Sequence, residues 1–383
     1  MNILIAPDSF KGSLSALQAG TTIKSAFLEV IPNANIEVIP MADGGEGTLE
    51  TLLFITKGKK ILFEATGPLN KKVMVEYGVL GDGRTIVIEI AKIAGLPMVP
   101  VGERNPLNTT TYGIGEVIKE CIENGYRDFI VGLGGSATND GGLGMLQALG
   151  VTFLNNQGRT VVPLGKSLSE VSYVDFSTIH PLIKECKFIV ASDVENLLCG
   201  EDGASVVFGP QKGATPKIVE ELDEALSNYA FHIETHLKKI YQNKKGAGAA
   251  GGLGFAFLLI GAEIKSGAKL MAKYTKLLEK IKTADWVITG EGQSDFQTLF
   301  GKVPGYIGKV AELNNVKALL LSGSLGNGYE ELYQYFVSCD SIANGPISLI
   351  DCMENADQLL YKKAYNLARL LKCIEKREVE FVE

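Results

Sequence analysis

The chain has 383 residues, of which 46% are hydrophobic and 21% charged, the composition of an ordinary folded protein with room for two or three domains. The formal net charge of -7, together with the lack of a Lys/Arg block, argues against a nucleic-acid-binding surface. Glycine is in excess: 44 of the 383 residues, about 11%, are glycine, whereas the average in proteins is about 7%. Because no Gly-X-Y period occurs, the excess indicates loops, or backbone that lies close to another group.

The N-terminal segment, the apolar stretches and the cysteines indicate the cellular location. The first ten residues lack the basic and apolar regions of a signal peptide. The longest apolar stretch, 249–262, is shorter than the roughly 20 residues of a membrane-spanning helix. The six cysteines form no Cys-x-x-Cys pair, which is typical of reduced thiols. The sequence therefore predicts a cytoplasmic protein that binds no membrane, and it leaves a homodimer open.

Short aliphatic runs recur along the chain, and each is followed by small or acidic residues. The runs lie at 3–5, 36–39, 129–131, 188–190, 286–288 and 319–321. Unbroken runs of this length predict strands that are buried on both faces, as in parallel sheets.

Helical patterns lie between these runs. Residues 13–30 contain Ser15-x-x-Gln18, the pattern of a capping box at a helix start. Near the C-terminus, apolar residues from Leu360 to Ile374 recur at helical spacing. The alternation of strands and helices predicts an α/β fold.

One region has a different pattern. Residues 73–79 and 86–90 alternate between apolar and other residues, and the segment between them contains Gly81-Asp82-Gly83-Arg84, which predicts a β-hairpin. The hairpin lies between two blocks of strand–helix alternation. We therefore expect one domain formed by residues 1–62 and 281–383, and a second α/β domain, residues 63–280, inserted into it.

Acidic residues follow several predicted strands. Asp8, Asp43, Asp193 and Glu291 with Asp295 all take such positions. In open parallel sheets, ligands bind beyond the carboxyl ends of the strands, and a buried carboxylate needs water, a partner or a metal. Asp43, Asp193, Glu291 and Asp295 are therefore candidate ligands of Mg²⁺. A solvated turn is the alternative for each of these loops.

The segment 132–142 is the densest glycine-rich loop. Its early glycines can expose consecutive backbone N–H groups, Ser136 and Thr138 add hydroxyls, and we expect a helix from about Asn139. Such a loop can bind a phosphate, and a structural turn is the alternative. Lys11 could offset the charge of a phosphate or carboxylate. No Walker A sequence occurs.

A second glycine cluster, residues 246–251, matches Gly-x-Gly-x-x-Gly. That fingerprint requires a preceding strand, whereas the polar stretch 217–240 has a helical pattern. An NAD-linked oxidoreductase is therefore kept as an alternative beside close helix packing, and a non-catalytic nucleotide-binding module as another. Because no histidine or cysteine lies in the glycine-rich motifs, the loops, hydroxyls and carboxylates favour phosphoryl transfer.

Six motifs distributed over most of the chain belong together. They are APDSFKGS at 6–13, MADGGEGT at 41–48, GLGGSATNDGG at 132–142, ASDVEN at 191–196, FGPQKG at 208–213 and TGEGQSD at 289–295. In this combination the sequence, from Asn2 to about Asn344, resembles the type I glycerate kinase family.

The resemblance implies ATP-dependent phosphorylation of D-glycerate, most often to 2-phosphoglycerate, with Mg²⁺ as cofactor. It also implies a flavodoxin-like domain and a second α/β domain, with the site in the cleft between them. The motifs suggest these roles: catalysis by Asp193, Lys11 and Asp8; nucleotide phosphate binding by Gly132, Gly134, Gly135, Ser136, Thr138 and Lys212; glycerate binding by Ser9, Asp43, Gly44 and Gly45; and metal binding by Asp193, Glu291 and Asp295.

Overall fold

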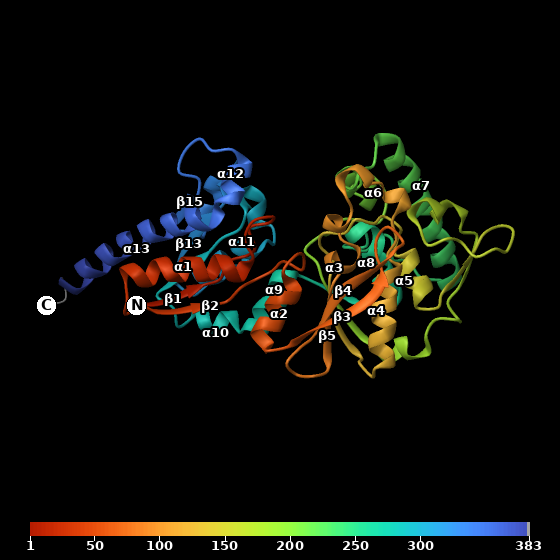
Figure 1. Cartoon of the computed structure of the whole chain (residues 1–383), viewed down its shortest axis with the longest axis horizontal. Helices are drawn as coiled ribbons and strands as arrows, with labels where there is room; N and C mark the ends of the chain where they lie inside the picture. Colours follow the sequence, from red (N-terminus) through yellow and green to blue (C-terminus); the bar gives the residue numbers. More distant parts are fainter. Residues whose placement is uncertain (381–383) are drawn as a thin grey trace. The chain divides into compact units, whose positions relative to one another are not determined.

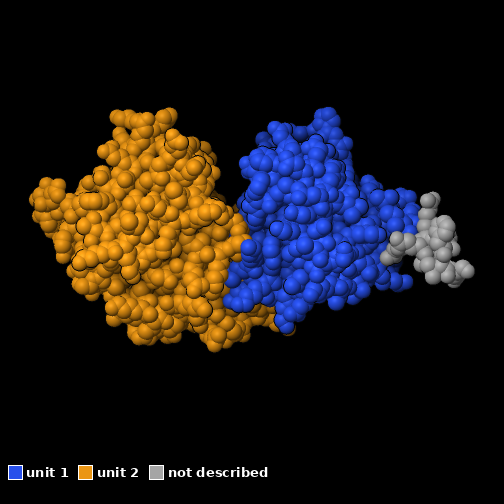
Figure 2. Space-filling view, turned by 180° about the vertical axis from the view of Figure 1, so that it is seen from behind, with its two compact units in different colours: residues 1–43, 268–383 blue, residues 44–267 orange. Residues whose placement is uncertain are grey.

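The structure, a computed structural model, describes residues 1–380, with side chains for residues 1–374. It divides into two compact units (Figure 2): unit 1 comprises Met1–Asp43 and Ala268–Glu383, and unit 2 comprises Gly44–Gly267. These limits differ from the expected ones at 62/63 and 280/281. Strand β3 (Lys59–Thr66) crosses the first expected limit, and it pairs along its whole length with β4 (Lys72–Val79) of unit 2.

Unit 1 contains a sheet of five parallel strands in the order β15-β13-β11-β1-β2. Numbered along the chain from the β2 edge, the order is 2-1-3-4-5, so the succession of strands reverses between β1 and β11. A crevice for a ligand forms beyond the strand ends at such a point. The four aliphatic runs predicted as strands in this unit are confirmed. The strands are β1 (Asn2–Ile5), β2 (Asn35–Val38), β11 (Trp286–Thr289), β13 (Lys317–Ser322) and β15 (Ser338–Ser341).

The two longest helices of unit 1, α1 (Ala16–Val30) and α13 (Ala356–Glu380), lie side by side on one face of this sheet (Figure 1). The predicted capping box is confirmed, because Ser15 Oγ accepts a hydrogen bond from Gln18 N and Gln18 Oε1 accepts one from Ser15 N. The predicted C-terminal amphipathic helix is confirmed within α13. The remaining helices of this unit are α9 (Gly267–Thr275), α10 (Leu277–Ile281), α11 (Val303–Leu313) and α12 (Leu349–Glu354), and a short parallel pair joins β12 (Gln293–Ser294) to β14 (Ser324–Leu325).

Unit 2 contains a six-stranded mixed sheet in the order β10-β9-β6-β5-β4-β3. The hairpin predicted from the alternating segments is confirmed, since β4 pairs antiparallel with β5 as well as with β3. The other four strands run parallel. Besides β3 and β4, the sheet contains β5 (Thr85–Glu89), β6 (Asp128–Gly132), β9 (Lys187–Ala191) and β10 (Glu263–Lys265).

A large apolar core lies in unit 2, and the stacked rings of Phe129 and Phe188 on neighbouring strands belong to it, with centroids 4.8 Å apart. The helix expected from about Asn139 begins instead at Leu143, because Gly141 and Gly142 adopt positive φ angles of 58° and 73°. The helices are α2 (Thr48–Thr56), α3 (Ala91–Ala94), α4 (Tyr112–Glu123), α5 (Leu143–Ala148), α6 (Ala204–Phe208), α7 (Pro216–Leu237) and α8 (Ala249–Leu259), beside a small antiparallel pair of β7 (Thr152–Leu154) and β8 (Tyr173–Asp175).

The glycine cluster 246–251 has a packing role. Helix α7 precedes it where a dinucleotide fingerprint requires a strand. Gly251 has a φ of 71°, and a Cβ at this position would overlap the carbonyl oxygen of Thr138. Gly141 N donates a hydrogen bond of 3.0 Å to Gly251 O. The cluster therefore packs against the loop 132–142, which supports the packing alternative.

Within residues 1–380, no helix has both the length and the apolar character needed to cross a membrane. The six cysteines all lie in the described part of the chain and are free thiols, as predicted.

Candidate active site

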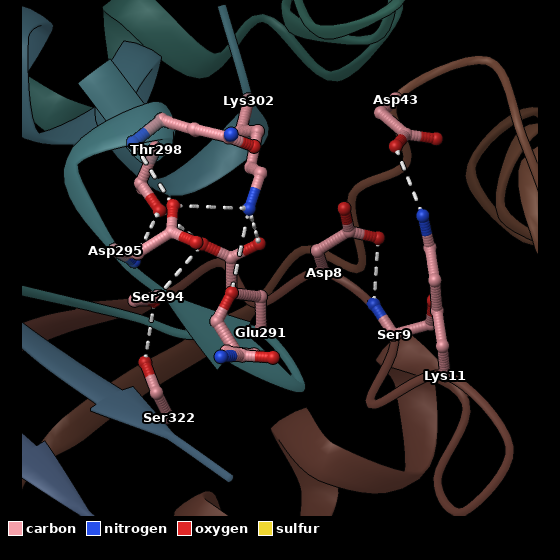
Figure 3. Close-up of polar contacts among 12 residues, drawn as sticks. Asp8, Ser9, Lys11, Asp43, Glu291, Ser294, Asp295, Thr298, Lys302 and Ser322 are labelled. Atoms are coloured by element: carbon pink, nitrogen blue, oxygen red, sulfur yellow. Dashed lines mark hydrogen bonds and ion pairs between the residues drawn. The ribbon is translucent and has the colours of Figure 1, made fainter. Parts of the chain in front are cut away.

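A cavity of about 410 Å³ opens beyond the carboxyl ends of the unit 1 strands. Five residues of its polar lining, Asp8, Ser9, Lys11, Asp43 and Glu291, lie on the loops that follow β1, β2 and β11 (Figure 3). The N–H of Asp8 donates a hydrogen bond of 2.8 Å to the carbonyl of residue 290, which joins two of these loops where the strand order reverses. The structure thus brings together five residues that the sequence singled out.

Asp8 is the buried carboxylate of this cavity, with an exposed fraction of 5%. Its Oδ1 accepts a hydrogen bond of 2.6 Å from Ser9 N. Burial raises the pKa of Asp8 well above its ordinary value, the charge of Asp43 adds to this effect, and Lys11 opposes it. A carboxylate whose pKa is shifted toward neutrality is suited to accept a proton from a hydroxyl group.

Lys11 and Ser9 offer polar groups to a ligand. The Lys11 ammonium lies 3.4 Å from the Asp43 carboxylate, and the lysine side chain is 64% exposed. The charge of Asp43 raises the pKa of Lys11, so the lysine is a cation at neutral pH. Ser9 Oγ is buried and has no hydrogen-bond partner among the described residues. A buried hydroxyl without a partner calls for a ligand or a water molecule.

Glu291 is held by two hydroxyl groups and a lysine (Figure 3). Its Oε1 accepts hydrogen bonds from Ser294 Oγ at 2.9 Å and Thr298 Oγ1 at 2.8 Å, and Lys302 Nζ lies 3.6 Å from Oε2. Burial raises the pKa of Glu291, whereas Lys302 and the two hydroxyls lower it. Ser294 is fixed in turn by a contact of 2.7 Å with Ser322 Oγ.

Asp295 caps the turn that follows it. Its Oδ1 accepts a hydrogen bond of 2.9 Å from Gln297 N and lies 3.9 Å from Lys302 Nζ. Glu291 and Asp295 therefore share one lysine as counterion.

The magnesium site expected from Asp193, Glu291 and Asp295 is not assembled within either unit. Asp193 follows β9 in unit 2 and is half-buried, whereas the other two carboxylates belong to unit 1. Nowhere in the described part of the chain do three or more His, Cys, Asp or Glu side chains form a group that could hold a metal. Mg²⁺ commonly binds through one or two carboxylates, with phosphates and water as the other ligands. Asp8 and Asp43, whose like charges lie close together, fit that requirement.

The glycines of the motifs at 41–48 and 132–142 bring two backbone segments of unit 2 together. A Cβ on Gly132 would lie 2.5 Å from Gly44 O, and a Cβ on Gly134 would overlap the Cα of Gly45. Gly134 N also donates a hydrogen bond of 3.2 Å to Gly44 O. Gly44, Gly45, Gly132 and Gly134, predicted to bind ligands, therefore have a packing role. Gly135 lines another cavity, which lies in unit 2.

Lys212 lies beneath the loop 132–138. Its side chain is 2% exposed, and Nζ donates hydrogen bonds to Ser136 Oγ at 3.0 Å and to the Thr138 carbonyl at 2.6 Å. Burial lowers the pKa of Lys212 to about 7. Asp140, which follows this loop, accepts hydrogen bonds from Thr111 N and Oγ1 at 2.9 and 2.8 Å and so fixes the end of the segment 132–142. Lys212 thus clamps the loop, and a nucleotide-binding role for Ser136 and Thr138 stays a prediction.

Sequence reasoning missed several residues of the unit 1 cavity. Lys302 immediately precedes α11 and stands in no recognisable motif. Leu349 and Met353 of α12 also line the cavity, and their spacing does not distinguish them from ordinary core residues. No local pattern in the sequence could have assigned these three residues to the site.

Comparisons with known proteins identify the family of this chain. The model of the glycerate kinase family matches residues 3–372. A glycerate kinase of Halalkalibacterium halodurans is 45% identical over 96% of this chain and 97% of its own, and a glycerate 2-kinase of Escherichia coli is 43% identical over 88% of each chain. A crystal structure of a candidate glycerate kinase 2 from Salmonella typhimurium LT2 matches with a TM-score of 0.84 and 40% identity, over 98% of this chain and 99% of that one. The resemblance found in the sequence is confirmed, and the chain belongs to the glycerate kinase family.

Proposed function

We propose that this enzyme transfers the γ-phosphoryl group of ATP to D-glycerate and forms 2-phosphoglycerate and ADP. The observation that carries the proposal is Asp8, a buried carboxylate with a raised pKa, beside the exposed ammonium of Lys11. Both line a cavity at the reversal point of a sheet with the 2-1-3-4-5 order of flavodoxin-like folds. The relatives named glycerate kinase and glycerate 2-kinase support the choice of substrate and product.

In this proposal, Asp8 accepts the proton of the C2 hydroxyl as the hydroxyl oxygen bonds to the γ-phosphorus and the bond from phosphorus to ADP breaks. Lys11 stabilises the negative charge on the transferred group. Ser9 Oγ, a buried hydroxyl without a partner among the described residues, donates a hydrogen bond to the glycerate carboxylate. The protein thus supplies a proton acceptor, a cation and a donor from one loop.

Asp43, with Asp8 beside it, is the residue that we propose to hold Mg²⁺. When bound, the ion would neutralise phosphate charge and orient the phosphate groups. The charge of Asp43 already raises the pKa values of both Asp8 and Lys11, so the site carries negative charge that a cation can offset. A role of Asp193 in catalysis and in metal binding stays a prediction.

The domain organisation is also part of the proposal. We assign unit 1 to the flavodoxin-like domain and unit 2 to the inserted α/β domain. The expected reaction site between domains, the homodimer and the cytoplasmic location stay predictions.

The test is ADP release by the purified protein with MgATP, measured with and without D-glycerate and with L-glycerate as a control. We expect release that depends on D-glycerate. Enolase, added to a sample of the products, should form phosphoenolpyruvate, because it accepts 2-phosphoglycerate but not 3-phosphoglycerate. ADP release equal to the sample without glycerate would contradict the kinase proposal, and a product that enolase leaves unchanged would contradict the proposed position of phosphorylation.

A further inference from the structure

We infer that the adenosine part of ATP binds in the unit 1 cavity, against an apolar wall that includes α12. The inference rests on the proposed kinase function and deepens it. The cavity, of about 410 Å³, falls in the range of roughly 300–1,000 Å³ that accommodates drug-sized ligands. A three-carbon acid at Asp8, Ser9 and Lys11 would occupy only part of that space. The rest of the cavity has room for a larger ligand.

The apolar wall has the chemistry of a nucleobase site. Leu349 is 73% exposed and lines the cavity, so a flat ligand that covers it removes apolar surface from water. Met353 adds a flexible thioether, which makes favourable contacts with aromatic rings. The apolar members of the wall are Ile342, Leu349, Cys352, Met353 and Ala356.

The apolar wall adjoins the polar part of the cavity directly. Gly12 follows Lys11 and has a φ of 79°, and a Cβ at Gly12 would lie 2.7 Å from Met353 Cε. Met353 therefore lies against the loop that carries Lys11 and the Ser9 hydroxyl, which has no hydrogen-bond partner among the described residues. A ligand that contacts both parts has an apolar group joined to an anionic group, as a nucleoside polyphosphate does and D-glycerate does not.

Charge also favours this cavity over the one in unit 2. The unit 1 cavity is lined by the three carboxylates of Asp8, Asp43 and Glu291 and by two lysines, Lys11 and Lys302. The unit 2 cavity, of about 400 Å³, is lined by the three carboxylates of Glu46, Glu76 and Glu89 and by one lysine. That lysine, Lys92, is paired with Glu76 at 3.3 Å. With the same number of carboxylates but one lysine fewer, the unit 2 lining is the more acidic and repels a polyphosphate more strongly.

The first test is the binding of magnesium AMP-PNP to the full chain by calorimetry, without glycerate. Leu349→Asp should weaken binding by about tenfold or more, because the charge replaces an apolar contact. Ile350→Asp is the matched control: Ile350 is the next residue of α12 and is 69% exposed, but it does not line the cavity. Its affinity should stay within about twofold of the unaltered protein, as expected for a surface substitution. Equal affinities of the two variants would overturn the inference.

The second test uses the unaltered protein and does not depend on how a variant folds. Cys352 lines the cavity and is half-buried, so magnesium AMP-PNP should slow its alkylation by iodoacetamide, measured by peptide mass spectrometry, by about tenfold. Cys373 of α13 is exposed and does not line the cavity, and its alkylation rate should not change. Nucleotide binding without protection of Cys352 would refute the inference alone. Absence of nucleotide binding would refute the proposed kinase function as well.

Discussion

The carboxylates of Asp8 and Asp43 follow the neighbouring strands β1 and β2, and they lie close enough for the charge of Asp43 to raise the pKa of Asp8. Burial of Asp8 is the larger cause of the same shift, from an ordinary value of 3.8. The ionised form of Asp8 is therefore disfavoured in the folded protein. Its contribution to stability is full below the unfolded pKa, falls as the pH rises toward the folded pKa, and is lost above it.

Asp8→Asn should therefore stabilise the protein at neutral pH. Asparagine keeps the shape of the side chain and the acceptor for Ser9 N, but it removes the group that titrates. The gain in melting temperature over the unaltered protein should be small near pH ~4 and should widen toward pH ~8. Thermal unfolding measured across this range checks the prediction. A gain that stays constant or shrinks with rising pH would show that the pKa of Asp8 is not raised in the folded protein.

Lys302→Met tests the anchoring of Glu291. The substitution leaves Glu291 buried without a counterion, and we expect a loss of about 1–3 kcal/mol in the free energy of unfolding, a figure reduced because Lys302 is 34% exposed. Urea unfolding at neutral pH gives the value. The double variant Lys302→Met with Glu291→Gln should recover much of the loss. If the two single effects simply add, the pair does not interact in the way that we describe.

Gly134→Ala should destabilise unit 2, because its Cβ would overlap the Cα of Gly45. Overpacking of this kind costs about 1–3 kcal/mol. Gly102→Ala serves as the control in the same unit: a Cβ there meets no heavy atom within 4 Å, so its effect should stay within about 0.5 kcal/mol. Chemical unfolding of the two variants compares them. Similar stabilities would argue against close packing of the two loops.

Lys212→Met separates a structural from a phosphate-binding role. Loss of the ammonium leaves Ser136 Oγ and the Thr138 carbonyl without their donor, and we expect a cost of about 1–3 kcal/mol in unfolding free energy. Because Lys212 is buried beneath its loop, the affinity for AMP-PNP, measured at a temperature where the variant is folded, should change by less than about twofold. A stable variant with strongly weakened nucleotide binding would instead place the ammonium at a phosphate.

Much of the fold could be predicted from local patterns, and the exceptions have identifiable causes. Buried parallel strands such as β1 and β13 appear in the sequence as unbroken aliphatic runs, and the capping box fixes the start of α1. Strand β3 has no clear local signal, because it begins with two exposed lysines, Lys59 and Lys60, and because Glu64 interrupts its apolar residues. The expected domain limit therefore falls inside β3, whose pairing with β4 is a tertiary property.

The site residues also divide into those that a local pattern in the sequence marks and those that only tertiary packing brings to the site. Asp8, Asp43 and Glu291 could be found because residues that directly follow parallel strands meet at one edge of the sheet. Lys302 and the apolar wall of α12 could not be found, since only packing brings them to that edge. Gly134 shows a further limit: the sequence indicates that backbone is exposed there, but not that Gly45, far away in the chain, fills the space.

The most direct test of the central claim is the initial rate of D-glycerate-dependent ADP release by the unaltered protein and by Asp8→Asn, with thermal unfolding as a check that both are folded. If Asp8 accepts the hydroxyl proton, the unaltered protein turns over and the variant is slower by about 10²–10⁴-fold, the usual contribution of a proton acceptor. A folded Asp8→Asn variant that turns over at the rate of the unaltered protein would contradict the account.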